Sequence, residues 1–305
     1  MPYRWRAWVF LAGLLCGWHS HAEPPGEIGA DSCLGCHNSA SITTVFQTVH
    51  GHSTAPDAPS ASEQCEACHG PGAAHGDRRV TSNDHGSIVG FSRNEDAELK
   101  NQACLGCHER HLPAEWVGSG HEFNDVSCSS CHKIHSLTDP VRLQASQAEV
   151  CVSCHRDVRS DTRKPSTHPV RLSHRAQLPV MTCSDCHAPH GSNSEGQLNR
   201  DTAVELCTSC HAEYAGPVLF EHAPVSEDCS LCHEPHGSIH GGMLLRQANQ
   251  LCQSCHSQRG HPSLLFTEEG LPSSQQSAMV LQRGCVNCHS QVHGSNHPSG
   301  FNLLR

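Results

Sequence analysis

Residues Cys183-Ser-Asp-Cys186-His187-Ala-Pro-His190-Gly191 contain the pattern that decides what fold this chain can adopt. Two cysteines are separated by two residues, and a histidine directly follows the second cysteine. The pattern Cys-x-x-Cys-His occurs ten times in the 305 residues, and it takes up every one of the 21 cysteines except Cys16. The motifs begin at Cys33, Cys65, Cys104, Cys128, Cys151, Cys183, Cys207, Cys229, Cys252 and Cys285.

The spacing within each motif has a chemical reason. Two thiols three positions apart can each add to one vinyl group of the same haem, and the histidine is then held beneath the porphyrin, where it can bind the iron. This is the attachment signature of haem c. The predicted thioether cysteines are Cys33, Cys36, Cys65, Cys68, Cys104, Cys107, Cys128, Cys131, Cys151, Cys154, Cys183, Cys186, Cys207, Cys210, Cys229, Cys232, Cys252, Cys255, Cys285 and Cys288. The predicted proximal ligands are His37, His69, His108, His132, His155, His187, His211, His233, His256 and His289.

Two other kinds of site use paired cysteines. Cys-x-x-Cys occurs in zinc sites and, in oxidising compartments, cysteines form disulfides. Neither requires a histidine after the second cysteine. Because His makes up 28 of 305 residues, chance would place it there at roughly one motif in ten, whereas all ten motifs have it. The sequence therefore predicts ten haem c groups.

Each iron needs a second axial ligand or an open position for chemistry. Only three methionines follow Met1, whereas 16 histidines lie outside the motifs and after residue 22. When the ten motifs are taken as five successive pairs, each pair has one histidine between its two motifs and another just after the second motif. The predicted distal ligands are His50, His75, His121, His135, His168, His190, His222, His236, His261 and His293.

The pattern leaves some choices open. His52 and His174 are alternatives to His50 and His168, and the sequence does not say which distal histidine serves which iron. His85, His111, His240 and His297 are expected to face solvent or haem propionates. Iron with two imidazole ligands has no vacancy for a substrate, and imidazole in place of methionine lowers the potential. The expected role is electron transfer and not catalysis.

The motifs alternate between two types, which predicts five tandem two-haem repeats, roughly 27–78, 98–140, 144–195, 200–240 and 246–297. The first type ends a short helix-like run, as in Thr202-Ala-Val-Glu205-Leu206 with its capping-box pattern and Ala148-Glu-Val150. The second type follows loop-like residues, as in Asp125-Val-Ser and Ser226-Glu-Asp. We expect a mostly irregular fold with short α-helices and little or no sheet. Because tandem repeats contact mainly their neighbours, the molecule should be elongated.

Composition agrees with a core that side chains do not fill. Aromatic residues are only 4% and apolar residues 36% of the chain, so haem must supply apolar surface. Residues 1–22 are expected to be a removed signal peptide, with Arg4 and Arg6, an apolar stretch and a Ser20-His21-Ala22 cleavage site. The exported domain is then 23–305. Its 18 basic and 30 acidic residues argue against nucleic-acid binding.

With these features the chain resembles the periplasmic decahaem cytochromes of the DmsE/MtrA family. The resemblance covers essentially all of 23–305 and rests on the count of ten motifs together with three stretches. These stretches are Cys65-Glu-Ala-Cys68-His69-Gly-Pro-Gly-Ala-Ala-His75, the stretch quoted first, and Cys285-Val-Asn-Cys288-His289-Ser-Gln-Val-His293-Gly-Ser-Asn-His-Pro-Ser-Gly. The Pro-His-Gly pattern is shared by many multihaem cytochromes, whereas the count and the C-terminal stretch are more specific.

The resemblance implies an exported wire in the periplasm that inserts into an outer-membrane β-barrel porin. Its partners would be an inner-membrane quinol dehydrogenase or a periplasmic cytochrome on one side, and an outer-surface multihaem cytochrome or reductase on the other. Electrons would pass outward to a metal, a mineral or DMSO, or inward from Fe(II) oxidation. Two alternatives stay open: a soluble periplasmic electron shuttle, which shares every site residue, and a multihaem nitrite- or hydroxylamine-type enzyme, which needs one five-coordinate haem.

Overall fold

The computed structural model describes residues 26–52, 59, 65–76, 88–111, 114–170, 181–256, 284–287 and 289–298. The predicted signal peptide, His85, His174, His261 and Cys288 therefore lie outside the described residues. The side chain of His111 also lies outside them, although its backbone is described.

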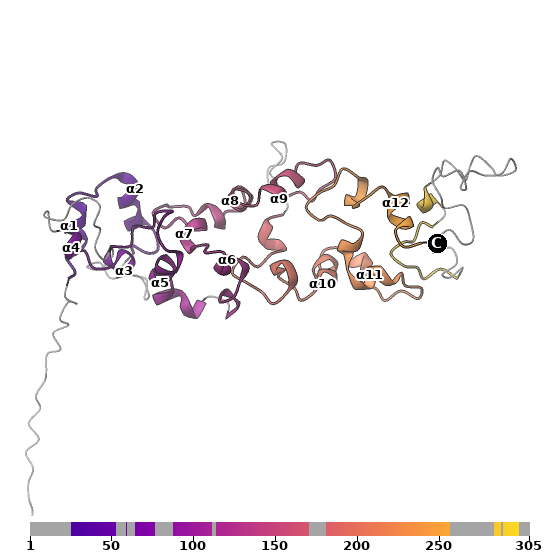
Figure 1. Ribbon diagram of the computed structural model, residues 1–305, viewed down its shortest axis with the longest axis horizontal. Helices are drawn as coiled ribbons and strands as arrows, with labels where there is room; N and C mark the ends of the chain where they lie inside the picture. The colour runs from indigo at the N-terminus through magenta and orange to yellow at the C-terminus, as the bar shows by residue number, and fades with distance from the viewer. Residues whose placement is uncertain are drawn as a thin grey trace, which may run out of the picture.

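The described chain forms an elongated body in which sequence order follows the long axis (Figure 1). The N-terminal helices α1 and α4 lie at one end and α12 lies near the other, as predicted for tandem repeats. The α-helices are short: α1 Ala30–Leu34, α2 Ala40–Thr43, α3 Glu66–His69, α4 Ala73–Gly76, α5 Ala97–His108, α6 Gly120–Phe123, α7 Cys128–Cys131, α8 Gln147–Cys151, α9 Arg156–Asp161, α10 Ala203–Thr208, α11 Ala223–Glu227 and α12 Ala248–Gln253.

Single 3-10 turns connect these helices, and irregular chain makes up most of the rest. The 3-10 turns are η1 Thr44–Gln47, η2 Glu109–His111, η3 Ala114–Trp116, η4 Pro140–Arg142, η5 Cys183–Asp185, η6 Glu195–Gln197, η7 Ala212–Tyr214, η8 Cys229–Leu231, η9 Gly241–Met243 and η11 Cys285–Asn287. Within the described ranges, extended pairing is limited to isolated antiparallel bridges: Ser166 with Ser238, His187 with Leu198, Phe220 with Ser295, and His233 with Leu244. The prediction of a mostly irregular fold with short helices is confirmed.

Helix ends follow local sequence signals. The longest helix, α5, begins where the Asp96 carboxylate accepts a hydrogen bond from the Glu98 backbone N–H at 2.8 Å. Of the capping box predicted at α10, the Thr202 half is present, since the Thr202 hydroxyl accepts from the Glu205 N–H at 3.1 Å. The helix predicted before Cys151 is α8.

The loop predicted before Cys229 is partly wrong. Ser226 and Glu227 lie in α11, which has Pro224 in its first turn. Proline is favourable there because its fixed φ suits the helix and its missing N–H has no intrahelical partner to lose. The Asp228 N–H then closes the turn on the Pro224 carbonyl at 3.1 Å. The expected loop is present before Cys128, where Val126 and Ser127 are not helical.

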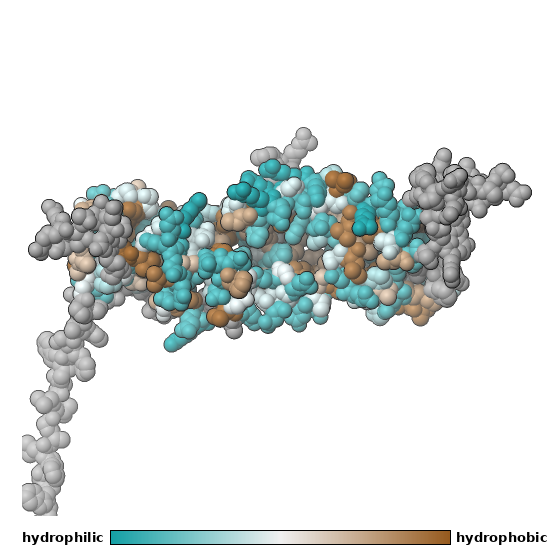
Figure 2. All heavy atoms as spheres, in the orientation of Figure 1, coloured by the Kyte–Doolittle hydropathy of each residue, from teal (hydrophilic) through white to brown (hydrophobic). Residues whose placement is uncertain are grey.

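Side chains alone make only a small core. The buried apolar residues in the described part of the chain are Ala30, Ala97, Trp116 and Val152. The visible surface is largely hydrophilic, with separate apolar patches along its length (Figure 2). Such a core is far too small to offset the conformational entropy of so long a chain, so another apolar component must complete it. No helix among the described residues is long and apolar enough to cross a membrane.

Candidate haem sites

Motif histidines face histidines from outside the motifs. In the described part of the chain there are nine such pairs, with ring centroids 5.9–6.3 Å apart. The pairs are His37 with His75, His69 with His135, His108 with His50, His132 with His190, His155 with His121, His187 with His236, His211 with His168, His233 with His293, and His256 with His222. Each pair joins a predicted proximal ligand to a predicted distal ligand.

This separation fits an iron between the two rings. Bonds of about 2 Å from iron to each Nε2, and about 1.1 Å from each nitrogen to its ring centre, require centroids roughly 6 Å apart. The described His, Cys, Asp and Glu side chains form no group of three or more that converges on one metal position. The described residues therefore fit haem held by one imidazole on each face.

Most pairs join different predicted repeats. The first motif histidine of a repeat faces the between-motif histidine of the repeat before it, as His211 faces His168. The second motif histidine faces the histidine that follows the second motif of the next repeat, as His187 faces His236. Only His37 and His75, at the N-terminal end, pair within one repeat. Each pair of adjacent repeats therefore exchanges two histidines.

Hydrogen bonds at Nδ1 determine which ring nitrogen faces the partner. The Nδ1 atoms of His121, His168 and His222 lie 2.8 Å from the carbonyl oxygens of Pro189, Pro235 and Val292. A carbonyl oxygen only accepts, so each Nδ1 carries the proton and each Nε2 keeps its lone pair for a metal. These carbonyls come directly before His190, His236 and His293. At three of the four junctions between predicted repeats, one hydrogen bond thus connects one exchanged histidine to the residue directly before the other.

Glycine allows this close approach. Gly191, Gly237 and Gly294 follow three of the predicted distal histidines and have φ values of +113°, +140° and +111°. A Cβ atom would lie 2.1 Å from the Glu115 carbonyl oxygen at Gly191, and 2.2 Å from the Asp161 carbonyl oxygen at Gly237. The His-Gly step is needed because the backbone after the histidine turns against the preceding repeat.

Burial favours the neutral form of several candidate ligands. Burial, together with the motif histidine opposite, lowers the pKa of His50, His190, His236 and His293. Burial also lowers the pKa of His69, although its hydrogen bond to the Val89 carbonyl acts in the opposite direction. An unprotonated imidazole is the form that can bind iron.

The cysteines link the motifs into one continuous series. Within each predicted repeat, the first cysteines of the two motifs lie close enough to interact: Cys33 with Cys65, Cys104 with Cys128, Cys151 with Cys183, Cys207 with Cys229, and Cys252 with Cys285. Between repeats, the second cysteines interact: Cys68 with Cys107, Cys131 with Cys154, Cys186 with Cys210, and Cys232 with Cys255. Every motif therefore neighbours the next one along the chain.

The within-repeat contacts alter the acidity of the cysteine thiols. A hydrogen bond from the Cys104 thiol lowers the pKa of Cys128 to about 7, and the same contact raises the pKa of Cys104. A hydrogen bond from the Cys151 thiol lowers the pKa of Cys183 to about 7 in the same way. All cysteines whose side chains are described are free of disulfides. The free thiols are therefore compatible with thioether attachment.

The remaining candidates fall into two groups. His52, His240 and His297 are not among the nine facing pairs, whereas the alternatives His50 and His168 each face a motif histidine. The predicted distal ligand His261 lies outside the described residues, and the nine pairs do not include the motif histidine His289. The contact between the Asp139 carboxylate and His132 could not be recognised from the sequence, because its only signal is an acidic residue seven positions after a motif histidine.

Comparisons with known proteins agree with this arrangement. A family model described as "Doubled CXXCH motif" matches residues 177–216 and 222–261, and one described as "Cytochrome c-type protein NrfB-like" matches residues 65–154. Each doubled match joins the second motif of one predicted repeat to the first motif of the next. The chain is also 46% identical over 280 residues to the "Multiheme cytochrome MtrA" of Shewanella baltica (strain OS185), which covers 91% of this chain and 81% of that protein.

Motifs of this type on short helices, with histidines facing them, define a c-type cytochrome that carries several haem groups and transfers electrons. The chain belongs to the MtrA family of multihaem cytochromes. The family resemblance that the sequence motifs indicated is confirmed.

Proposed function

We propose that this chain carries ten haem c groups, each with two histidine ligands, and moves electrons along them as a molecular wire. The observation that carries the proposal is the series of nine facing histidine pairs along the chain, with ring centroids 5.9–6.3 Å apart. From Cys33 to Cys285, cysteines of successive motifs also lie close enough to interact electrostatically. Haem c supplies one-electron redox chemistry when it is bound.

The residues of the chain have three tasks in this proposal. The cysteines hold each porphyrin by thioethers, so neighbouring groups stay at fixed separations. The paired imidazoles occupy both axial positions and leave no site for a substrate, which favours a carrier over a nitrite- or hydroxylamine-type enzyme. The exchanged histidines tie adjacent repeats together, so the row stays continuous while electrons pass in either direction.

The proposed setting is the periplasm and the outer membrane, inside a β-barrel porin. An elongated row of sites fits a route across a membrane better than a compact carrier does. Electrons would come from an inner-membrane quinol dehydrogenase or a periplasmic cytochrome, and would leave to an outer-surface multihaem cytochrome or reductase. The likeness to the protein named MtrA supports this setting.

The test is cell fractionation followed by haem staining, with a count of haem per purified chain. The proposal predicts ten haems, and a haem band that stays with the detergent-extracted outer membrane and co-purifies with a barrel protein. Fewer haems would contradict the row of ten. A band released by osmotic shock, with no barrel partner, would identify a periplasmic shuttle.

A further inference from the structure

One motif histidine differs from its counterparts in what its Nδ1 contacts. His69, His187 and His233 belong to second motifs of their repeats, and each places Nδ1 2.7–2.9 Å from a backbone carbonyl oxygen, of Val89, Gly196 and Gly242 respectively. At His132, the second motif of the second repeat, Nδ1 lies 2.6 Å from Oδ2 of Asp139. A full negative charge here takes the place of a neutral carbonyl.

The Asp139 carboxylate is held firmly and is shielded from water. Its Oδ1 accepts a hydrogen bond from the Lys133 backbone N–H at 3.2 Å. The side chains of His132 and Asp139 are 30% and 17% exposed. Partial burial of this kind strengthens a charge-assisted hydrogen bond, because solvent screens it less.

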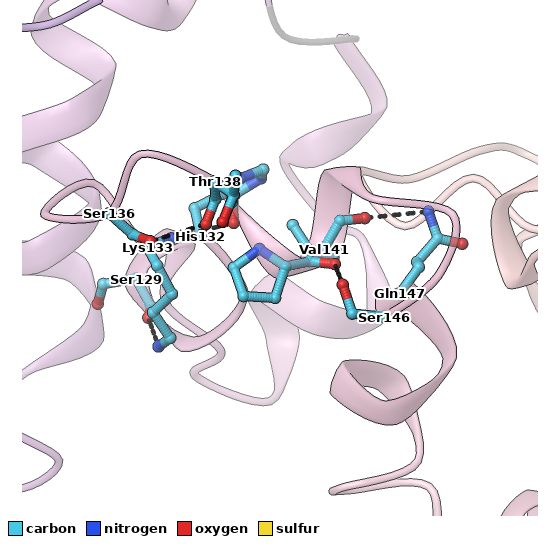
Figure 3. A network of polar contacts seen from close by, with 10 residues as sticks. Ser129, His132, Lys133, Ser136, Thr138, Val141, Ser146 and Gln147 are labelled. Atoms are coloured by element: carbon cyan, nitrogen blue, oxygen red, sulfur yellow. Dashed lines mark hydrogen bonds and ion pairs between the residues drawn. The ribbon is translucent and has the colours of Figure 1, made fainter. Parts of the chain in front are cut away.

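The surrounding loop is braced on both sides of Asp139 (Figure 3). Before it, the Ser136 hydroxyl donates to the Thr138 carbonyl at 2.8 Å. After it, the Ser146 hydroxyl donates to the Pro140 carbonyl at 2.7 Å, and the Gln147 amide donates to the Val141 carbonyl at 3.1 Å. These bonds hold the backbone of the loop that carries Asp139, and the bond from the Lys133 N–H orients the carboxylate itself.

Another carboxylate lies near a motif histidine but differs in kind. Glu213 Oε1 lies 3.5 Å from Nδ1 of His211, and the two side chains are 60% and 52% exposed. That distance is longer than a charge-assisted hydrogen bond, and solvent screens exposed charges. Of the five motif histidines compared, His132 is therefore the one with a short, partly buried carboxylate contact.

A carboxylate on Nδ1 draws the ring proton toward itself and increases electron density on the ring. The Nε2 atom then becomes a stronger donor to a metal, and ferric iron gains more from this than ferrous iron because its charge is higher. We propose that Asp139 lowers the reduction potential of the haem held at Cys128 and Cys131 below those of the haems whose histidines bond to carbonyls. This inference rests on the proposed attachment of haem at that motif.

In the proposed wire, the reduction potential would therefore be lower at this haem than at the haems whose histidines bond to carbonyls. Cys128 begins the fourth of the ten motifs, so this site has neighbours on both sides. A site of lower potential is the last to hold an electron when the row is partly reduced. Asp139 would thereby divide the row into two segments that fill with electrons first. It acts through His132 and is a positioning and tuning residue.

The test compares the full-length, haem-loaded protein with its D139N and D139E variants. Asn keeps the size of Asp and an acceptor oxygen, so D139N removes the charge and little else. Asp228 provides a matched control, because its carboxylate bonds the Ser230 N–H and hydroxyl, each at 2.8 Å, beside the Cys229 motif, and no bond to a histidine is involved. D228N therefore measures the effect of losing a charge near a motif.

Haem content is measured first, so that a loss of attachment is separated from a change in potential. Spectroelectrochemical titration should then show that about one haem in ten becomes easier to reduce in D139N, with an expected tenfold shift in its reduction equilibrium, or about 59 mV. The low-spin ferric EPR signal of that haem should shift too, because it reports the donor strength of the histidines. D139E should restore both values toward the unmodified protein.

Two outcomes would overturn the inference. One is a D139N protein with ten haems whose titration and EPR spectrum match the unmodified protein. The other is a D228N control that shifts one haem as far as D139N does. A protein with fewer than ten haems before any substitution would instead contradict the proposed function.

Discussion

Nδ1 of His168 donates a hydrogen bond to the Pro235 carbonyl oxygen at 2.8 Å, although 67 residues separate them in sequence. His168 faces His211, while His236, the residue after Pro235, faces His187. A single hydrogen bond therefore connects His168 to the residue directly before His236, and these are the two histidines that the third and fourth predicted repeats exchange. The same bond recurs one repeat earlier, between His121 and Pro189, and one repeat later, between His222 and Val292. These predicted repeats are interlocked through their candidate ligands, and each of them takes facing histidines from its neighbours.

Replacement of His236 by Ala should open one iron in the preceding repeat. Because His236 faces His187, we expect about one tenth of the ferric haem to change from low-spin to high-spin in the EPR spectrum. His240→Ala is the control, since His240 is close in sequence but is not one of the facing pairs. An entirely low-spin spectrum for His236→Ala would refute the assignment.

Every predicted distal histidine except His261 belongs to one of the nine facing pairs. We therefore expect His261 to face the motif histidine His289. At the N-terminal end His37 pairs with His75 of the same repeat, so the C-terminal end is expected to close locally as well. His261→Ala should create one high-spin haem, and added imidazole should return it to low spin by replacing the missing ligand. If the spectrum of His261→Ala stays unchanged, another residue binds this iron.

Gly237→Ala should weaken the junction between the third and fourth repeats. The new Cβ would meet the Asp161 carbonyl oxygen at 2.2 Å, and the φ of +140° is unfavourable for Ala. We expect a loss of about 1–3 kcal/mol in stability, seen as a lower midpoint in thermal unfolding.

Gly241→Ala serves as the control for that substitution. A Cβ there meets nothing within 4 Å, and Gly241 does not have the left-handed backbone conformation. Its unfolding midpoint should match that of the unmodified protein. Equal midpoints for both variants would show that the close approach at Gly237 is not needed.

Glu66 should make the N-terminal end sensitive to acid. Burial of its carboxyl raises the pKa, but the N–H groups of Gly72, Gly29 and Ile28 outweigh this, and the net pKa lies below the ordinary 4.5. A lowered folded-state pKa means that the ionised form stabilises the fold above about pH 4.5. That contribution is lost as the pH falls through the folded-state value.

Hydrogen exchange of the Ile28, Gly29 and Gly72 amides can measure this effect. At neutral pH, Glu66→Gln should reduce their protection by about 1–3 kcal/mol, and it should flatten the dependence of protection on pH below 4.5. Glu98→Gln, which changes an exposed carboxylate on α5, should leave these amides unaffected. Equal protection in Glu66→Gln and the unmodified protein would contradict the prediction.

Features that depend on a few neighbouring residues could be predicted from the sequence. Attachment of haem needs two cysteines and a histidine within five positions. The motif at Cys183 can therefore be recognised from the sequence, without knowledge of the tertiary structure. The Thr202 cap and the helices that carry Cys104 and Cys151 also follow from local patterns. The helix at Ser226 and Glu227 was missed because these polar residues resemble a loop, and the effect of Pro224 outweighed them.

The sequence by itself determined the class of cofactor, the family, the elongated and mostly irregular fold, and the set of candidate ligand histidines. Only the tertiary structure decided which histidine faces which. His211, for example, takes a partner from the repeat before it and His187 takes one from the repeat after it. The reason is physical. Covalent attachment is a short-range constraint written in the spacing of residues, whereas ligand pairing depends on how the repeats pack, and contacts such as that of His168 with Pro235 form only when distant segments meet.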